Sequence, residues 1–91
     1  MPNQIRCSHI LVKTEDEAKE IYEDLIDGAK FNLLAEMKSQ CPSRKKGGDL
    51  GAFGRGQMVK PFEKVAFALE KGQLSAPVKT EFGWHVIKRV E

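Results

Sequence analysis

The chain has 91 residues, of which 41% are hydrophobic, 31% charged and 8% aromatic, and its formal net charge is +2. This length fits one domain, and the 8 Gly, 4 Pro and 2 Cys exclude collagen-like, disordered and disulfide-stapled chains. A spanning helix is also excluded, because the longest segment without Asp, Glu, Lys or Arg covers only residues 72–78.

The net charge and the first six residues give expectations about binding partners and cellular location. Duplex-binding domains concentrate more positive charge on one face than a net charge of +2 indicates, so we expect no nucleic-acid partner. Residues 1–6 contain no apolar signal core, which predicts a cytoplasmic location. Cysteines there stay reduced, so we interpret Cys7 and Cys41 as free thiols.

A strand and a helix are predicted first along the chain. Residues 5–13 form a β-branched run with apolar side chains at both odd and even positions, which is typical of a central strand covered on both faces. Thr14 and Glu17 form a capping box for the next helix, with Thr14 as N-cap. Gly28 ends this helix. Its buried stripe consists of Ala18, Ile21, Tyr22, Leu25 and Ile26.

The middle of the chain predicts a second helix over residues 31–39, which buries Phe31, Leu34 and Ala35. Residues 40–49 have the composition of a loop, with one tight helical turn after Pro42. The turn carries the basic triplet Arg44-Lys45-Lys46.

The last third predicts a short strand over residues 50–53, a helix and two further strands. Pro61 suits the first turn of the helix and Gly72 its end. A tight turn at residues 81–83 joins strands over 76–80 and 84–90. The order β-α-α-turn-β-α-β-β predicts an α+β domain with helices packed on a four-stranded sheet. The buried stripe of the third helix consists of Phe62, Val65, Ala66 and Leu69.

Four reactive polar residues stand out: His9, Cys41, Thr80 and His85. Each histidine lies in the middle of an apolar strand, where its ring nitrogens need hydrogen-bond partners. Either one alone is typically an ordinary core residue. Because both occupy such positions, we expect them to meet across the sheet.

Residues of these types also occur in metal sites and in nucleophilic active sites. Cys7, His9, Cys41 and His85 lack the ligand spacing of structural zinc sites, so we expect no metal and no other cofactor. A Cys–His nucleophile pair built on Cys41 stays open, although no orienting carboxylate is evident from the sequence.

Three apolar residues flank glycine-rich and turn segments. Phe62 fits a core position at helical spacing, whereas Met58 and Phe82 lie where loop residues are usually polar. Together they predict an apolar cup at the edge of the sheet. Beside paired histidines and a thiol, such a cup suits a proline ring.

Four segments resemble the signature blocks of the parvulin peptidyl-prolyl cis/trans isomerases. They occur in the family's order and span essentially the whole chain, so residues 1–91 resemble a single minimal parvulin domain. The segments are Cys7-Ser8-His9-Ile10-Leu11-Val12-Lys13, Gly48-Asp49-Leu50-Gly51-Ala52-Phe53, Gly56-Gln57-Met58-Val59-Lys60-Pro61-Phe62 and Phe82-Gly83-Trp84-His85-Val86-Ile87.

The resemblance implies the parvulin (FKBP-like) fold, a four-stranded antiparallel sheet surrounded by helices. It also implies a catalytic set of paired histidines, a linked hydroxyl residue and a position that holds Cys or Asp. These are His9 and His85, Thr80, and Cys41, respectively. The implied proline pocket consists of Leu50, Met58 and Phe62, with Phe82 at its rim.

The implied activity is rotation about X-Pro bonds in peptides and unfolded clients, which assists protein folding without a covalent step. Since the family accepts Asp at the Cys41 position, a nucleophile is disfavoured. Phosphate-directed parvulins carry a long basic loop where residues 13–17 are short and acidic, so we expect no phosphate preference. Only the Arg44-Lys45-Lys46 triplet offers a competing anion site.

Two non-catalytic interpretations compete with this one. A chaperone-like module would hold proline-containing or unfolded segments in the same cup. An anion-binding adaptor would use exposed lysines, but acidic residues interspersed among them favour an ordinary surface. We expect a monomer, while weak contact of the basic residues with a membrane surface stays open. The lysines concerned are Lys60, Lys64, Lys71 and Lys79.

Overall fold

Eight elements follow one another in the order that the sequence predicts. The computed structural model describes residues 3–91 and has a radius of gyration of 11.8 Å. None of the helices in this described part is long and apolar enough to cross a bilayer. The elements are β1 (Gln4–Val12), α1 (Glu15–Ile26), α2 (Phe31–Lys38), the 3₁₀ helix η1 (Pro42–Lys46), β2 (Asp49–Gly54), α3 (Lys60–Ala68), β3 (Val78–Thr80) and β4 (Gly83–Arg89).

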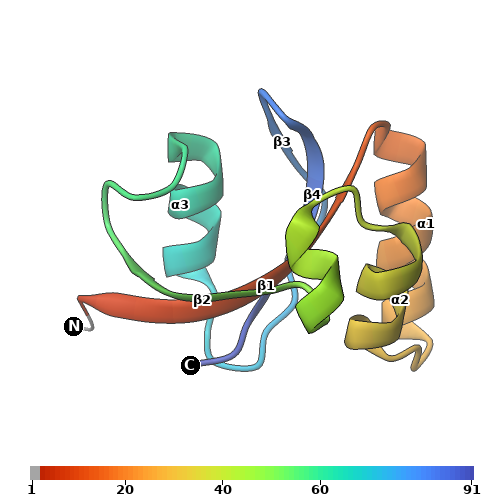
Figure 1. Cartoon of the computed structure of the whole chain (residues 1–91), viewed down its shortest axis with the longest axis horizontal. Helices are drawn as coiled ribbons and strands as arrows, with labels where there is room; N and C mark the ends of the chain where they lie inside the picture. The colour runs from red at the N-terminus through yellow and green to blue at the C-terminus, as the bar shows by residue number, and fades with distance from the viewer. Residues whose placement is uncertain (1–2) are drawn as a thin grey trace.

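The four strands form one antiparallel sheet in the order β2-β1-β4-β3, which places β1 and β4 at its centre. Successive side chains of β1 point to opposite faces. Ile5 and Cys7 pack with residues of α3 on one face, while Ile10 and Val12 pack with residues of α1 and α2 on the other. Figure 1 shows α3 well apart from α1 and α2, which lie side by side. The predicted fold and the two-sided burial of the first strand are therefore confirmed.

The predicted N-cap of α1 is confirmed, but its buried stripe is shorter than predicted. Thr14 accepts a hydrogen bond from the Glu17 backbone N–H at 3.2 Å, and its hydroxyl donates to the Glu17 carboxylate at 2.9 Å. Ile26 is 63% exposed, so its predicted burial is wrong. Leu25 packs against the core, and Ile26 lies about 100° further around the helix.

Two predicted boundaries in the last third are also wrong. The helix α3 ends at Ala68 and not at Gly72, because the Leu69 backbone is extended. The Arg89 guanidinium donates to the Leu69 carbonyl at 2.7 Å and so satisfies the helix end without a glycine cap. The strand predicted from residue 76 begins only at Val78, after Pro77, which has no N–H to donate to a sheet.

A bulge in β2 decides which face each of its residues reaches. Arg6 pairs with Ala52 and Ser8 with Asp49, so β2 has one residue more than β1 between these pairs. Gly51, at φ +74°, supplies the left-handed backbone that the bulge needs. The extra residue moves Leu50 to the α3 face and Asp49 to the opposite face.

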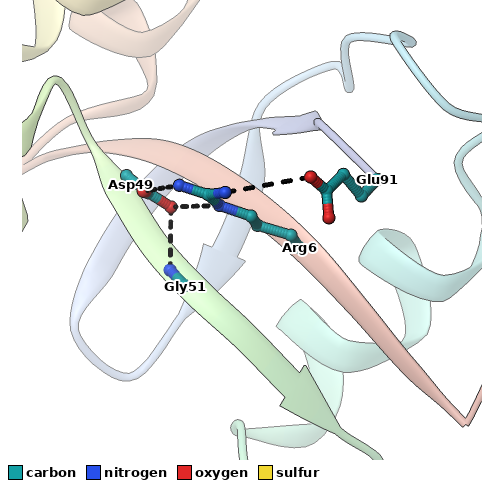
Figure 2. Close-up of polar contacts among 4 residues, drawn as sticks. All are labelled: Arg6, Asp49, Gly51 and Glu91. Atoms are coloured by element: carbon teal, nitrogen blue, oxygen red, sulfur yellow. Dashed lines mark hydrogen bonds and ion pairs between the residues drawn. The ribbon is translucent and has the colours of Figure 1, made fainter.

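The bulge is held by the Asp49 carboxylate (Figure 2). It accepts a hydrogen bond from the Gly51 N–H at 2.8 Å and two from the Arg6 guanidinium, which also lies 3.8 Å from Glu91. The Arg6 side chain, followed by the Gly51 N–H, lowers the pKa of Asp49 below its ordinary value. The Asp49 carboxylate therefore fixes both the bulge and the face of the sheet to which Leu50 points.

Close approach of two backbones requires glycine at position 48. The Gly48 carbonyl accepts a hydrogen bond from the His9 N–H at 2.9 Å, and a Cβ at Gly48 would lie 2.5 Å from the His9 carbonyl oxygen. The residue also has φ +89°. Its lack of a side chain lets the chain enter β2 directly against His9.

Gly48→Ala should therefore cost more stability than Gly72→Ala, which is a matched control. Gly72 has φ +84° and no atom within 4 Å of an added Cβ, so its substitution adds backbone strain alone. That strain amounts to roughly 1–2 kcal/mol, and overpacking against His9 adds about 1–3 kcal/mol at Gly48. Urea unfolding of both variants measures the difference. Equal losses would show that the clash relaxes freely.

Candidate active site

A cavity of about 450 Å³ opens on the α3 face of the sheet. It brings together residues from both central strands, the loops before η1 and α3, and the β3–β4 turn. Every site residue predicted from the sequence lines it except Thr80, which contacts a lining residue. The lining residues are His9, Leu11, Gln40, Cys41, Pro42, Leu50, Gln57, Met58, Val59, Phe62, Phe82 and His85.

The two histidines lie next to each other on the α3 face. His9 pairs with Ile87 and Leu11 with His85, so the rings are diagonal neighbours across β1 and β4. Their Nδ1 atoms lie 2.9 Å apart, and the side chains are only 5% and 3% exposed. A single proton must lie between the two Nδ1 atoms, which requires complementary tautomers. The predicted meeting of the histidines across the sheet is confirmed.

Burial keeps both rings neutral. Burial, together with the neighbouring His85 in the case of His9, lowers the pKa of each histidine from 6.5 to about 4. Protonating both rings would place two N–H groups against each other and introduce charge into an apolar site. At neutral pH the pair therefore acts as a hydrogen-bonded dipolar unit without net charge.

Thr80 connects this pair to the β3–β4 turn. Its Oγ1 lies 2.6 Å from His85 Nε2 and accepts a hydrogen bond from the Phe82 N–H at 3.1 Å. Hydrogen bonds therefore run without a break from the β3–β4 turn through Thr80 and His85 to His9. Within residues 3–91, His9 Nε2 is buried and has no hydrogen-bond partner.

Apolar side chains form the wall around the rings. Phe62 is 2% exposed and presents its ring edge-on to His9 and His85, with centroids 5.6 and 5.3 Å away. Leu50 and Met58 pack against the same core. Phe82 is 63% exposed at the mouth of the cavity. The cup predicted from these residues is therefore formed.

Cys41 is held at the cavity by the end of β1. Its N–H donates to the Ser39 hydroxyl at 3.3 Å, and the same oxygen accepts the Leu11 N–H at 3.1 Å. The Gln40 N–H also donates to the Leu11 carbonyl at 2.8 Å. No hydrogen bond joins the Cys41 thiol to either histidine in the described chain. The arrangement therefore lacks the thiol–imidazole contact that a nucleophile pair requires.

Cys7 does not line the cavity. It is fully buried in the α3-side core, where burial raises the pKa of its thiol to about 11. This agrees with its interpretation as a small core residue. Across residues 3–91, no group of three or more His, Cys, Asp or Glu side chains is placed to hold a metal ion.

Five lining residues were missed by the sequence analysis. Leu11 could have been found, because it lies two positions after His9 on the same face of one strand. The others are loop residues whose orientation no periodicity predicts, and only their adjacency to Cys41 and Met58 points to them. They are Gln40, Pro42, Gln57 and Val59.

Comparison with known proteins agrees with this geometry. The model of the rotamase family, the PPIC-type PPIase domain, matches residues 9–91. This chain belongs to the PPIC-type peptidyl-prolyl isomerases, the parvulins. The solution structure of the parvulin of Nitrosopumilus maritimus superposes with a TM-score of 0.89 at 51% identity, covering 100% of this chain and 99% of that one.

Curated relatives include both longer and similar-sized proteins. Foldase protein PrsA 4 of Bacillus cereus is 55% identical over 93% of this chain, which spans only 31% of the foldase. Peptidyl-prolyl cis-trans isomerase Pin1 of Malus domestica is 43% identical, with 96% of this chain and 93% of that protein covered. The chain thus spans about a third of the first of these relatives and nearly all of the second.

The low pKa values of the histidines predict that acid destabilises the fold before carboxylates titrate. Because the unfolded chain binds more protons than the folded chain between about pH 6.5 and 4, this stabilisation is complete above pH 6.5 and is lost as the pH falls through 4. The maximal slope is about 1.4 kcal/mol per pH unit for each histidine. Imidazole ¹⁵N NMR should show both rings neutral at pH 5. Titration of either ring near 6.5 would contradict the lowering of its pKa by burial.

Proposed function

We propose that this domain accelerates cis/trans isomerisation of X-Pro bonds in peptides and unfolded proteins without a covalent step. The observation that carries the proposal is an apolar cavity of about 450 Å³ with two neutral, hydrogen-bonded histidines in its lining. Membership of the parvulin family supports the same activity.

The cavity suits the physical problem of rotating an imide. The barrier of about 18–20 kcal/mol arises from amide resonance, which is lost when the bond is twisted. The twisted state is less polar than the planar amide, so transfer from water to an apolar wall favours it. We assign the proline ring to the cup formed by Leu50, Met58 and Phe62, with Phe82 covering its mouth.

The polar residues have a separate role in this proposal. His9, His85 and Thr80 keep the floor of the cavity in a fixed, uncharged arrangement, and preorganised dipoles need no rearrangement when the substrate twists. Cys41 stands at the edge of the cavity, where its thiol provides a weak hydrogen-bonding group to the rotating carbonyl. The proposed catalytic residues are thus His9, Cys41, Thr80 and His85.

We propose further that phosphate before proline is not preferred. The first turn of α1, which follows β1 after only two residues, carries three exposed acidic residues, Glu15 to Glu17, which disfavour a phosphate. Of the basic triplet in η1, Arg44 and Lys45 do not line the cavity, and Lys46 lines a groove on the opposite face. The positive charge of the triplet is therefore not directed at the substrate.

Clients and location are part of the proposal. A relative with 55% identity bears the name foldase, which supports unfolded proline-containing clients. We also propose that the domain acts as a monomer in the cytoplasm. Two free cysteines, one of them fully buried, agree with a reducing compartment.

Isomerisation rates for peptides that vary only before proline test the function. Leu or Arg before proline should give the strongest acceleration and phosphoserine the weakest, with Glu between them. The reason is that the acidic first turn of α1 disfavours anions. A phosphoserine preference would refute the substrate assignment. Binding without acceleration of any peptide would identify a holding module.

Cys41→Asp tests the absence of covalent chemistry. Asp retains an acceptor at the edge of the cavity but cannot form a thiol adduct, so kcat/KM should stay within about one order of magnitude of the unmodified domain, equivalent to 1.4 kcal/mol. Cys7→Ser is the comparison for thiol loss away from the cavity. A folded Cys41→Asp protein with activity lost by a thousandfold would establish the thiol as a nucleophile.

A further inference from the structure

A second cavity, of about 890 Å³, is larger than the active-site cavity, and cations surround it. We call it the basic groove. Six of the 15 basic residues of the chain line it, whereas only one of the 13 acidic residues, Asp49, does so. The six cations are Arg6, Lys30, Lys46, Lys71, Lys88 and Arg89.

The basic groove and the active-site cavity share the central strands but open on opposite faces. Arg6, Ser8 and Lys88 lie at the strand positions that face α1 and α2, whereas His9 and His85 face α3. No residue lines both cavities. The groove is therefore not an extension of the proline pocket.

The groove already contains one carboxylate of the chain itself, that of Asp49. Arg6 binds Asp49 through two hydrogen bonds and also lies within 3.8 Å of the Glu91 carboxylate (Figure 2). In the described chain none of the four lysines has an acidic partner within 4 Å, although Lys46 lies near enough to Asp49 to help lower the pKa of that carboxyl. These lysines are Lys30, Lys46, Lys71 and Lys88.

We propose that the basic groove binds an extended acidic segment of the same client whose X-Pro bond occupies the active site. This inference rests on the proposed isomerase function. The groove combines its cations with apolar lining from Ala29, Phe31 and Val90, which suits a peptide of mixed acidic and apolar residues. Binding the acidic segment raises the local concentration of the proline segment at the active site.

Other polyanions fit this lining less well. Single-stranded nucleic acid needs exposed aromatic rings on which bases stack, but the one aromatic residue of the groove, Phe31, is half-buried against the core of α1 and α2. A flat bilayer cannot follow a concave lining. An extended peptide can reach both the floor and the rim.

The dimensions of the domain fix the spacing that such a client needs. The molecule measures 32 × 26 × 22 Å, so a chain must pass around the sheet edge to reach both faces. At about 3.3 Å per extended residue, roughly eight to ten residues are required. A flexible Gly-Ser spacer needs about 25 residues to match this span on average. A three-residue spacer reaches only about 10 Å, so only the far end of an acidic tail behind it comes within reach of the groove.

Tailed substrates test this requirement. Three peptides would carry the same Ala-Leu-Pro-Phe core, followed by a 25-residue Gly-Ser spacer and six Glu, the same spacer and six Gln, or a three-residue spacer and six Glu. At low salt the long-spaced Glu peptide should show a KM about five- to twentyfold below that of the Gln peptide, with kcat unchanged. The short-spaced Glu peptide should show a clearly smaller gain, because only its last Glu residues can reach the groove. In 0.5 M NaCl the advantage should shrink to less than about twofold.

A pair of charge-matched variants locates the effect. Lys46→Gln/Lys88→Gln should abolish the gain, whereas Lys19→Gln/Lys64→Gln, which removes the same charge outside the groove, should preserve it. NMR titration with a free hexaglutamate peptide should shift the Arg6 and Lys88 amides. Equal loss in both variants, or equal KM for the Glu and Gln peptides, would overturn the proposal.

The remaining outcomes separate the two proposals from each other. Acceleration of all peptides without any tail effect refutes the groove and leaves the isomerase intact. No acceleration, with hexaglutamate still shifting the groove amides, refutes the isomerase but supports the acidic-peptide site. Binding of oligodeoxythymidine or phosphatidylglycerol vesicles through Lys46 and Lys88, without binding of hexaglutamate, would show that the partner class is wrong.

Discussion

The hydrogen bond between the Nδ1 atoms of His9 and His85 is the interaction on which the site depends. It is lost once both rings are protonated, and burial under Phe62 keeps the rings neutral. The pairing of β1 with β4 sets the separation of the rings, and Thr80 holds His85 from the other side. The core and the site therefore share residues, and the buried polar groups other than His9 Nε2 are tolerated because they satisfy one another.

The bulge in β2 determines which residue of that strand lines the proposed proline pocket. Without the extra residue, strand alternation would place Asp49 on the α3 face and Leu50 on the opposite face. The bulge reverses both, giving the pocket an apolar wall and Arg6 a carboxylate partner. A charged residue beside the two histidines would stabilise their protonated forms, so the reversal also keeps the neutral pair intact.

Short-range patterns predicted the elements and much of the site. Strand alternation and apolar context placed His9 and His85 together, and the Thr14 capping box located α1. Residues fixed by distant contacts could not be predicted in this way. Leu50 was assigned to the pocket only through resemblance to the parvulins, since alternation alone gives the wrong face. The end of α3 depends on Arg89, which lies 20 positions away in the sequence.

The sheet separates the two cavities electrostatically as well as spatially. The low pKa values of His9 and His85 arise from burial and, for His9, from its histidine neighbour, with no contribution from the lysines or arginines of the basic groove. Charge on that face therefore does not tune the histidine pair. Binding in the groove can alter how often a proline segment occupies the site, but not the barrier that it meets there. An acidic client would accordingly gain in KM and not in kcat.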